Sequence, residues 1–230
     1  IEIASSLICE AIKQAKAICI IGDFDADGAT STAICMLALK AFGHKNIDYL
    51  VPNRFDFGYG LSPEIVDVAY QQKAEFIITV DNGISCVEGV SHAKKLGMKV
   101  VVTDHHLPGY TLPDADAIVN PNQPGCEFLS KNLAGVGVAF YVMLAVKAQL
   151  QREGWFEEKN IQPPNLANYL DIVALGTVAD VVPLDENNRV LVHQGLQRIR
   201  SGFARPGIKA ILEVAARPCH KLSSTDLGFV

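Results

Sequence analysis

Runs of apolar residues without polar alternation divide the first half of the chain. They are ICIIG (18–22), IDYLV (47–51), FIITVD (76–81) and KVVVTD (99–104). A strand that is covered on both faces has no polar side to show, and β-branched residues favour strands. These runs therefore predict four strands in the interior of a sheet that is covered on both faces.

Helical patterns lie between the runs. The segment 30–43 ends in a glycine, which favours a helix end. The segment 62–73 begins with Ser62 and Pro63, which suit an N-cap and a first helical position. A third segment, 85–97, ends in Lys-Lys-Leu-Gly. Strands that alternate with helices predict an α/β fold with a mostly parallel, doubly wound sheet and helices on both faces.

A turn-rich break, DAIVNPNQPGC (116–126), precedes a mainly helical C-terminal segment. Helices are predicted near 134–152, 165–178, 189–200 and 206–216. We expect a single unit over 1–230, with a sheet core over roughly 1–125 and a mainly helical portion over 126–230. The chain starts at Ile1 and shows no sign of a terminus at its other end, so we interpret it as a fragment of a longer protein.

Composition is that of a globular protein, with 49% hydrophobic and 20% charged residues. No apolar stretch approaches the ~18 residues of a membrane span, and no signal-peptide pattern is visible, so no membrane association is expected. The six cysteines form no C-x-x-C pair and mostly sit in apolar runs. This pattern favours reduced thiols in a cytoplasmic protein over disulfides or a zinc site.

The net charge of −5 argues against nucleic acid as a partner, but the charges are unevenly distributed. Between Arg189 and Lys221, seven Lys and Arg stand against one acid, Glu213. This stretch is either a solvated helix face or a stripe that faces phosphates, and the sequence leaves both interpretations open.

Three aspartates stand at alternate positions directly after the first apolar run, in GDFDADG. They are Asp23, Asp25 and Asp27. A calcium-binding EF-hand loop requires an acid at its twelfth position, which is Ile34 here, and a helix before the loop where this chain has a strand. A P-loop is excluded because no Gly-Lys-Ser/Thr follows. Repulsion between the three acids still calls for a cation of some kind.

Asp23, Asp81 and Asp104 each follow a predicted strand, so they should meet at the carboxyl edge of the sheet, where α/β proteins bind ligands. A single strand-end aspartate is more often a turn residue or helix cap. Here, however, the acids are joined by His105, His106 and a further acid, Asp180. Oxygen ligands with imidazole suit manganese or magnesium better than zinc. So many ligands predict two ions that share a carboxylate.

The motifs GDFDADG, VDNGIS, TDHH and GTVADVVPL, in this order, resemble the four motifs of the DHH phosphoesterase superfamily. The segments VPNRFDFGYGLS, NPNQPGC and LAGVGVAFY are similar to the superfamily's single-strand-specific exonucleases. The resemblance covers essentially the whole chain. It implies that 1–230 is a DHH catalytic domain, and that further domains follow in complete members.

The resemblance also implies roles for individual residues. His106 would contact phosphate, Asp104 would orient the histidine pair, and Asp81 would bridge two divalent cations, manganese or magnesium. Asp23 stands where other members carry histidine. The metal ligands would be Asp23, Asp25, Asp27, Asp81, His105 and Asp180.

Three residues would grip the substrate: Arg54 and Tyr59 at the 5′ end of the strand, and Arg189 at a phosphate. The alternatives are a turn aromatic for Tyr59 and a solvated helix start for Arg189. Gly135 and Gly137 either present backbone N–H groups to an anion or allow close packing.

The implied activity is that of a two-metal phosphodiesterase that degrades single-stranded DNA from 5′ to 3′ in DNA repair and recombination. One alternative is a small-substrate member of the superfamily, acting on oligonucleotides or pyrophosphate. Another is a non-catalytic replication scaffold, although such proteins lose metal ligands and this chain holds a competent residue at each position. The sequence identifies no protein partner.

Overall fold

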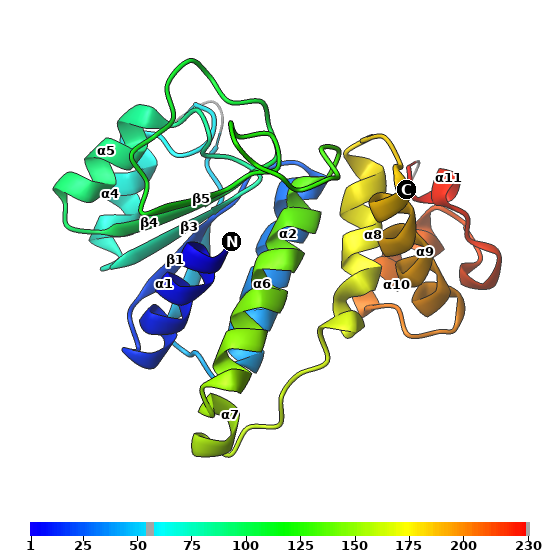
Figure 1. Cartoon of the computed structure of the whole chain (residues 1–230). Helices are drawn as coiled ribbons and strands as arrows, with labels where there is room; N and C mark the ends of the chain where they lie inside the picture. Colours follow the sequence, from blue (N-terminus) through cyan, green and yellow to red (C-terminus); the bar gives the residue numbers. More distant parts are fainter. Residues whose placement is uncertain (54–57, 229–230) are drawn as a thin grey trace.

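Five parallel strands form the single sheet of the computed structural model, which describes residues 1–53 and 58–228. Their order in the sheet is β2-β1-β3-β4-β5 (Figure 1). The strands are β1 (Ile18–Ile21), β2 (Ile47–Leu50), β3 (Phe76–Val80), β4 (Lys99–Thr103) and β5 (Ala117–Val119). The parallel pairing with helical crossovers confirms the predicted α/β class.

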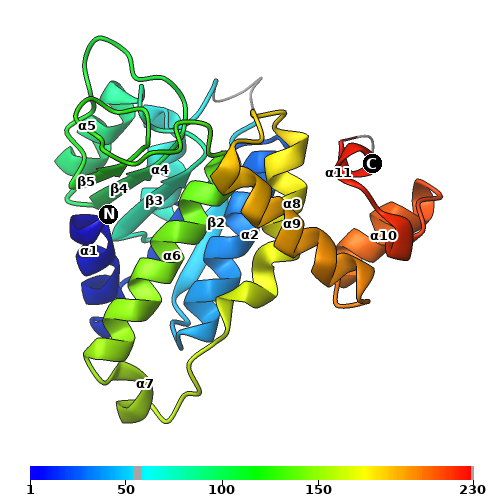
Figure 2. The same ribbon diagram turned by 45° about the vertical axis from the view of Figure 1, so that its right-hand side comes forward.

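Helices cover both faces of the sheet, as the continuous apolar runs require (Figures 1 and 2). On one face lie α1 (Glu2–Lys13), α2 (Ala26–Ala41) and α6 (Gly135–Arg152), and on the other α4 (Pro63–Gln71) and α5 (Val87–Lys95). Alternate residues of a strand enter the two cores: Ile20 packs with the first group and Ile21 with the second. Burial of apolar surface on both sides holds the three layers together.

The C-terminal portion is helical and packs beside the sheet through α8 (Leu170–Ala179), which lies between α2 and α9 (Glu186–Arg200). The remaining elements are α7 (Trp155–Glu158), η1 (Leu166–Tyr169), α10 (Pro206–Val214), η2 (Cys219–Lys221) and α11 (Ser224–Leu227). Figures 1 and 2 show α10 and α11 at the periphery, away from the sheet.

Several elements were not predicted, including the short α7, η2 and α11, and some helix starts differ from the predicted ones. Helix α1 was missed, and β5 lies inside the segment read as a break. Helix α2 begins within GDFDADG, because the Asp25 side chain accepts a hydrogen bond from Gly28 N and caps the helix there. Helix α9 begins at Glu186 because Asp185 caps it in the same way. A strand of three residues such as β5 carries too little pattern to be recognised.

Within the described residues, no helix is long and apolar enough to cross a membrane. All six cysteines are free thiols, three of them buried.

Candidate metal centre

The order of the sheet reverses at β1, which pairs with β2 on one side and β3 on the other. The crevice at the carboxyl ends of the two strands that flank such a switch point is where doubly wound proteins bind ligands. Asp23 follows β1 and Asp81 follows β3, while Asp104 follows β4. The predicted convergence of the acids at this edge is therefore observed.

The turn after β1 fixes two of the three motif acids. Asp25 caps α2 by accepting from Gly28 N at 2.9 Å, and Asp23 Oδ1 accepts from Phe24 N at 2.8 Å. A Cβ on Gly28 would lie 2.5 Å from the carbonyl oxygen of Asp23, so only glycine allows this close turn.

The third acid, Asp27, is held by the N-terminus of α6. Gly135 N donates to Asp27 Oδ2 at 2.6 Å and Val136 N to Oδ1 at 2.8 Å. The anion that Gly135 binds is thus a carboxylate of the chain itself, and the positive end of the helix dipole partly compensates the acid cluster. A Cβ on Gly135 would lie 2.7 Å from Asp81, whereas Gly137 packs on Leu133.

Among the residues that the structure describes, three overlapping groups of candidate ligands lie at this edge, with the ligand atoms of each group within 4.8 Å of one another. They are Asp23–Asp25–Asp81, Asp27–His105–Asp180 and Asp81–His105–His106. Asp81 and His105 each belong to two groups, so the groups form one centre. Asp180 reaches it from the C-terminal cap of α8, which joins the helical portion to the sheet.

The donor atoms of the centre suit a divalent cation. Asp81 Oδ1, Asp180 Oδ2 and His105 Nε2 are buried and have no hydrogen-bond partner among the described residues. His105 Nε2 lies 3.2 Å from Asp81 Oδ1 and 3.5 Å from Asp180 Oδ2. Buried polar atoms that point at one another without partners are costly, and a hard cation with carboxylate and imidazole ligands satisfies them.

Burial, and then repulsion between neighbouring carboxylates, raises the pKa of several acids in the centre. Burial first and Asp25 next raise the pKa of Asp81 to about 8. Burial and the charge of Asp81 raise the pKa of Asp27 well above its ordinary value. Burial likewise raises the pKa of Asp23 and of Asp180. Without a cation, the folded chain thus favours protonated carboxyls here.

Asp104 organises the histidine pair. Its Oδ1 lies 2.7 Å from His106 Nδ1, and its Oδ2 accepts from Ile84 N at 2.9 Å. Burial alone would raise the pKa of Asp104, but the hydrogen bonds from His106 and Ile84 outweigh it and lower that pKa. The same bond to Asp104 raises the pKa of His106. On its other side, His106 Nε2 lies 3.5 Å from the hydroxyl oxygen of Tyr59.

Two features at the centre were not evident from the sequence: the backbone conformation of Asp81 and the contacts of the Asn82 side chain. Asp81 has a φ of 61°, in the left-handed region that costs non-glycine residues energy. Its neighbour Asn82 is buried, and its Nδ2 donates to Ile21 O at 3.1 Å and to Val80 O at 2.9 Å. The side chain of Asn82 therefore ties together the ends of β1 and β3 at the switch point. The only hint in the sequence is an amide beside a glycine after a strand.

The structure describes only two of the three predicted substrate-binding residues. Arg54 lies outside the described residues. Tyr59 is half-exposed and lies beside His106, with its ring edge-on to the imidazole. Arg189 is exposed and donates to Leu184 O at 2.9 Å, so its phosphate role stays a prediction.

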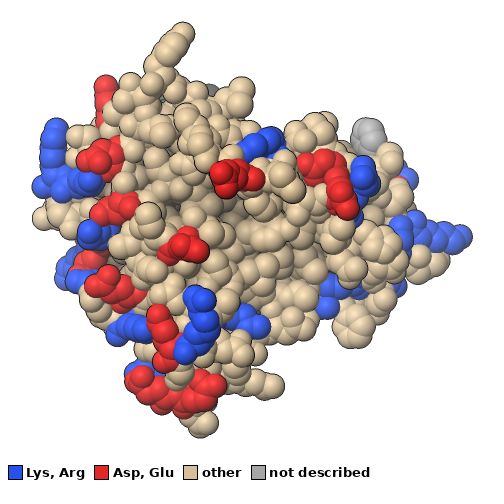
Figure 3. All heavy atoms as spheres, in the orientation of Figure 1, with Lys and Arg blue, Asp and Glu red and all other residues tan. Residues whose placement is uncertain are grey.

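Several cations of the predicted basic stripe make internal contacts. Figure 3 shows Lys and Arg side chains at the end of the molecule formed by the C-terminal helices. Arg205 donates to the fully buried Asp171 at 3.0 Å from its guanidinium and at 2.9 Å from its backbone N. Arg200 Nε donates to Leu222 O at 2.7 Å. These arginines tie the helices to one another, which accounts for part of the charge excess without nucleic acid.

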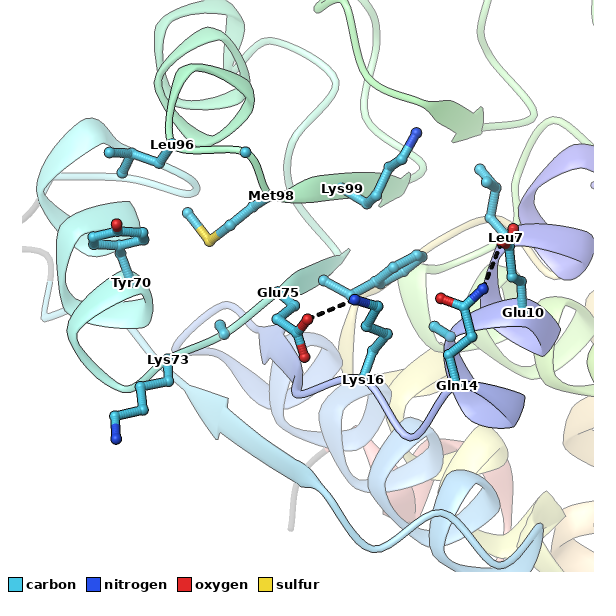
Figure 4. Close-up of a pocket in the computed structure, with 14 residues that line it drawn as sticks. Leu7, Glu10, Gln14, Lys16, Tyr70, Lys73, Glu75, Leu96, Met98 and Lys99 are labelled. Atoms are coloured by element: carbon cyan, nitrogen blue, oxygen red, sulfur yellow. Dashed lines mark hydrogen bonds and ion pairs between the residues drawn. The ribbon is translucent and has the colours of Figure 1, made fainter.

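A separate hollow of about 610 Å³ lies at the opposite, amino-terminal edge of the sheet (Figure 4). Phe76 and Met98 contribute apolar surface to it, and an ion pair of 2.6 Å joins Lys16 and Glu75 across it. It contains none of the acids or histidines of the candidate metal centre, so we do not take it for the active site.

The fold and the site together define a class: doubly wound α/β proteins with a carboxylate–histidine centre at the switch point of the sheet. Residues 17–177 match the model of the "DHH family, N-terminal domain". The chain belongs to the DHH family.

Among curated proteins, the chain is similar to the single-stranded-DNA-specific exonuclease RecJ of several bacteria. It is 62% identical over 229 residues to that of Salmonella typhimurium, covering 100% of this chain and 40% of the relative. It is 38% identical over 226 residues to that of Bacillus subtilis, covering 98% of this chain and 27% of the relative. The chain thus spans well under half the length of these relatives.

Solved structures agree in fold. One described as exonuclease RecJ bound to manganese superimposes with a TM-score of 0.82 at 33% identity, covering 99% of this chain and 54% of that chain. RecJ of Thermus thermophilus in complex with Mn²⁺ superimposes with a TM-score of 0.77 at 32% identity, covering 99% of this chain and 31% of that chain.

Proposed function

We propose that residues 1–230 form the catalytic domain of a metal-dependent exonuclease that degrades single-stranded DNA from its 5′ end. Relatives that match over the full length of the chain carry the name single-stranded-DNA-specific exonuclease, which supports the substrate class. The 5′-to-3′ direction rests on the resemblance of the motifs. Since the relatives are longer, the proposal assigns to this chain the chemical step and the contacts nearest to it.

The observation that carries the proposal is the set of buried, unpartnered atoms on Asp81, His105 and Asp180. We assign Asp23, Asp25 and Asp81 to one divalent cation, and Asp27, His105 and Asp180 to a second, with Asp81 shared. Solved relatives are described as bound to manganese or to magnesium. Such cations, when bound, supply polarisation of the phosphate and activation of water.

The residues around the centre bind and orient the substrate. Asp104 fixes the ring of His106 and raises the pKa of its imidazole, so a protonated His106 donates to a phosphate oxygen as negative charge develops there. Tyr59, beside His106, offers a face for the terminal base and a hydroxyl donor. Arg54 would clamp the terminal phosphate.

The test combines metal binding with digestion. Calorimetry should find two manganese ions per chain, and Asp81→Asn should lose both events, since asparagine tolerates the backbone conformation of Asp81 but lacks its charge. Asp48→Asn, on the exposed edge strand β2, is the matched control.

Digestion of end-labelled single strands should begin at the 5′ end in manganese and stop in EDTA. A dinucleotide and pyrophosphate serve as competing substrates. Faster turnover of either than of long strands would favour a small-substrate enzyme, and absence of metal binding would favour a scaffold.

A further inference from the structure

We propose that Asn120 and Asn122 are positioning residues that hold the backbone of the histidine pair. Asn122 would act on His105, the candidate metal ligand, and Asn120 on His106, the residue that faces phosphate. The proposal rests on the proposed function for the roles of the two histidines. The contacts on which it is built belong to the NPNQ segment, residues 120–123.

Both asparagine side chains donate to carbonyl oxygens of the histidine pair. Asn120 is the first residue after β5 and is 1% exposed. Its Nδ2 donates to His106 O at 2.9 Å. The Nδ2 of Asn122, which is half-buried, donates to His105 O at 2.6 Å. Each histidine thus has its own amide partner.

These side-chain hydrogen bonds replace the backbone hydrogen bonds of the sheet beyond the ends of β4 and β5. The backbone bond from Asp104 N to Val119 O, at 3.1 Å, is the last between β4 and β5. The carbonyls of the next two residues would lack partners beyond that point. On the other side, Asp104 Oδ1 accepts from the backbone N of His105 at 2.7 Å and of His106 at 3.1 Å. The histidine backbone is therefore held from both sides.

The clamp is itself fixed. The backbone N of Asn122 donates to Asn120 Oδ1 at 2.7 Å, so the side chain of Asn120 also holds the backbone of Asn122. Lys131 Nζ donates to Pro121 O at 2.8 Å and to Cys126 O at 2.7 Å, which closes the loop of residues 120–131. The chain then runs into α6, whose first N–H groups hold Asp27. One stretch of chain thereby positions ligands on both sides of the centre.

The competing explanation is that these asparagines only stabilise the loop. A substitution at Gln123 distinguishes this explanation from the proposal. Gln123 lies in the same loop, and its Nε2 donates to Ile118 O at 3.0 Å, in β5 rather than in the histidine pair. Gln123→Ala therefore removes the same kind of amide–carbonyl bond without touching His105 or His106. It is the matched control for Asn122→Ala, while Asn120→Ser replaces the buried carboxamide by a smaller hydroxyl group without emptying the site.

The first measurement is made on the metal-free chain. Long-range ¹H–¹⁵N spectra report the imidazole nitrogens of its six histidines. Asn122→Ala should shift and broaden the signals of His105, and Asn120→Ser those of His106. Gln123→Ala should leave both unchanged. This readout depends on ring position and not on metal or activity.

The second measurement is manganese binding and strand cleavage. Asn122→Ala should weaken manganese binding by about 10- to 100-fold, the range typical of residues that orient metal ligands. Asn120→Ser should lower kcat while leaving KM near that of wild type, and it should weaken manganese binding less than Asn122→Ala does. Gln123→Ala should change neither, whatever its effect on thermal stability.

The proposal is overturned if Asn122→Ala, folded as judged by its backbone spectrum, matches Gln123→Ala in both the His105 signals and manganese affinity. If wild type itself binds no manganese, the proposed function fails, while the imidazole signals still decide whether the asparagines hold the histidines. Should Asn120→Ser not fold, Asn122→Ala alone decides.

Discussion

Adjacent histidines in this chain occupy different environments, although the sequence presents them as a pair. His105 Nε2 faces Asp81 and Asp180 at ion-pair distance, whereas His106 Nδ1 is bound to Asp104 and its ring is half-exposed next to Tyr59. His106 Nδ1 also lies 4.0 Å from Asp81 Oδ1. We propose a division of labour in which His105 serves the metal centre and His106 serves the substrate.

This division predicts different kinetic outcomes. His105→Ala should weaken manganese affinity, because it removes a ligand atom. His106→Ala should leave manganese affinity nearly intact and lower the cleavage rate by ~10²–10³, the usual loss when one transition-state donor is removed. Titration calorimetry and single-turnover cleavage measure the two quantities. Equal losses of metal affinity in both variants would contradict the assignment.

At the scale of elements, the start of α6 holds Asp27, and α8 carries Asp180 at its C-terminal cap. Gly135 allows the backbone of α6 to approach Asp27 and Asp81, and Asp171 on α8 is joined to Arg205 near the start of α10. Each contact joins segments that lie far apart in the sequence.

Gly135→Ala should disrupt the centre, because the added Cβ would lie 2.7 Å from Asp81. We expect a stability loss of about 1–3 kcal/mol, typical of overpacking, together with weaker manganese binding. Gly207→Ala provides the control, since no atom lies within 4 Å of its added Cβ. Denaturant unfolding and calorimetry on both variants test this. Unchanged manganese affinity in Gly135→Ala would show that the contact is not needed.

Arg205→Ala should destabilise the chain by about 3–5 kcal/mol, because it leaves the fully buried Asp171 without its charged partner. Lys209→Ala, on the exposed face of α10, should change the unfolding midpoint little. If the two variants unfold alike, Arg205 is not structural, and the basic stripe regains its interpretation as a phosphate-facing surface.

Much of the sheet could be predicted because strands buried on both faces leave an unbroken apolar run, as in FIITV. Strand β5 could not, because it is only three residues long. Helix α1 was missed although its sequence does carry a helical pattern, with Ala4, Ile8 and Ala11 buried on one face. The acids of the sequence motifs allowed the location of the centre to be predicted. The sequence offered Gly135 as a possible donor of backbone N–H groups to an anion, but it could not identify that anion as Asp27, which lies 108 positions away.

Across the whole molecule, the centre makes stability depend on pH. Burial raises the folded pKa of Asp81 from its ordinary value of 3.8 to about 8, and the pKa values of Asp23, Asp27 and Asp180 are also raised. A raised folded pKa means that the folded chain binds more protons than the unfolded chain. The stability that these groups contribute is therefore complete below about pH 4 and is lost as the pH rises toward 8.

In EDTA, the Tm of wild type should be lower at pH 8 than at pH 5 by about 5 °C or more. Excess magnesium should raise the Tm more at pH 8 than at pH 5. Asp81→Asn should flatten this dependence, which separates the centre from other titrating groups such as His44. Thermal unfolding at the two pH values tests this. A metal-free Tm that rises with pH in wild type but not in Asp81→Asn would contradict the assigned protonation.

The hydrogen bonds between Asp27 and the start of α6 join residues 108 and 109 positions apart. Closing so long a loop is entropically unfavourable, so this contact should form late on the folding pathway. A cation that binds only the finished centre then stabilises the native state but not the folding transition state. Manganese should accordingly slow unfolding while leaving the refolding rate unchanged. The metal would therefore stabilise the folded protein against unfolding without assisting the folding reaction.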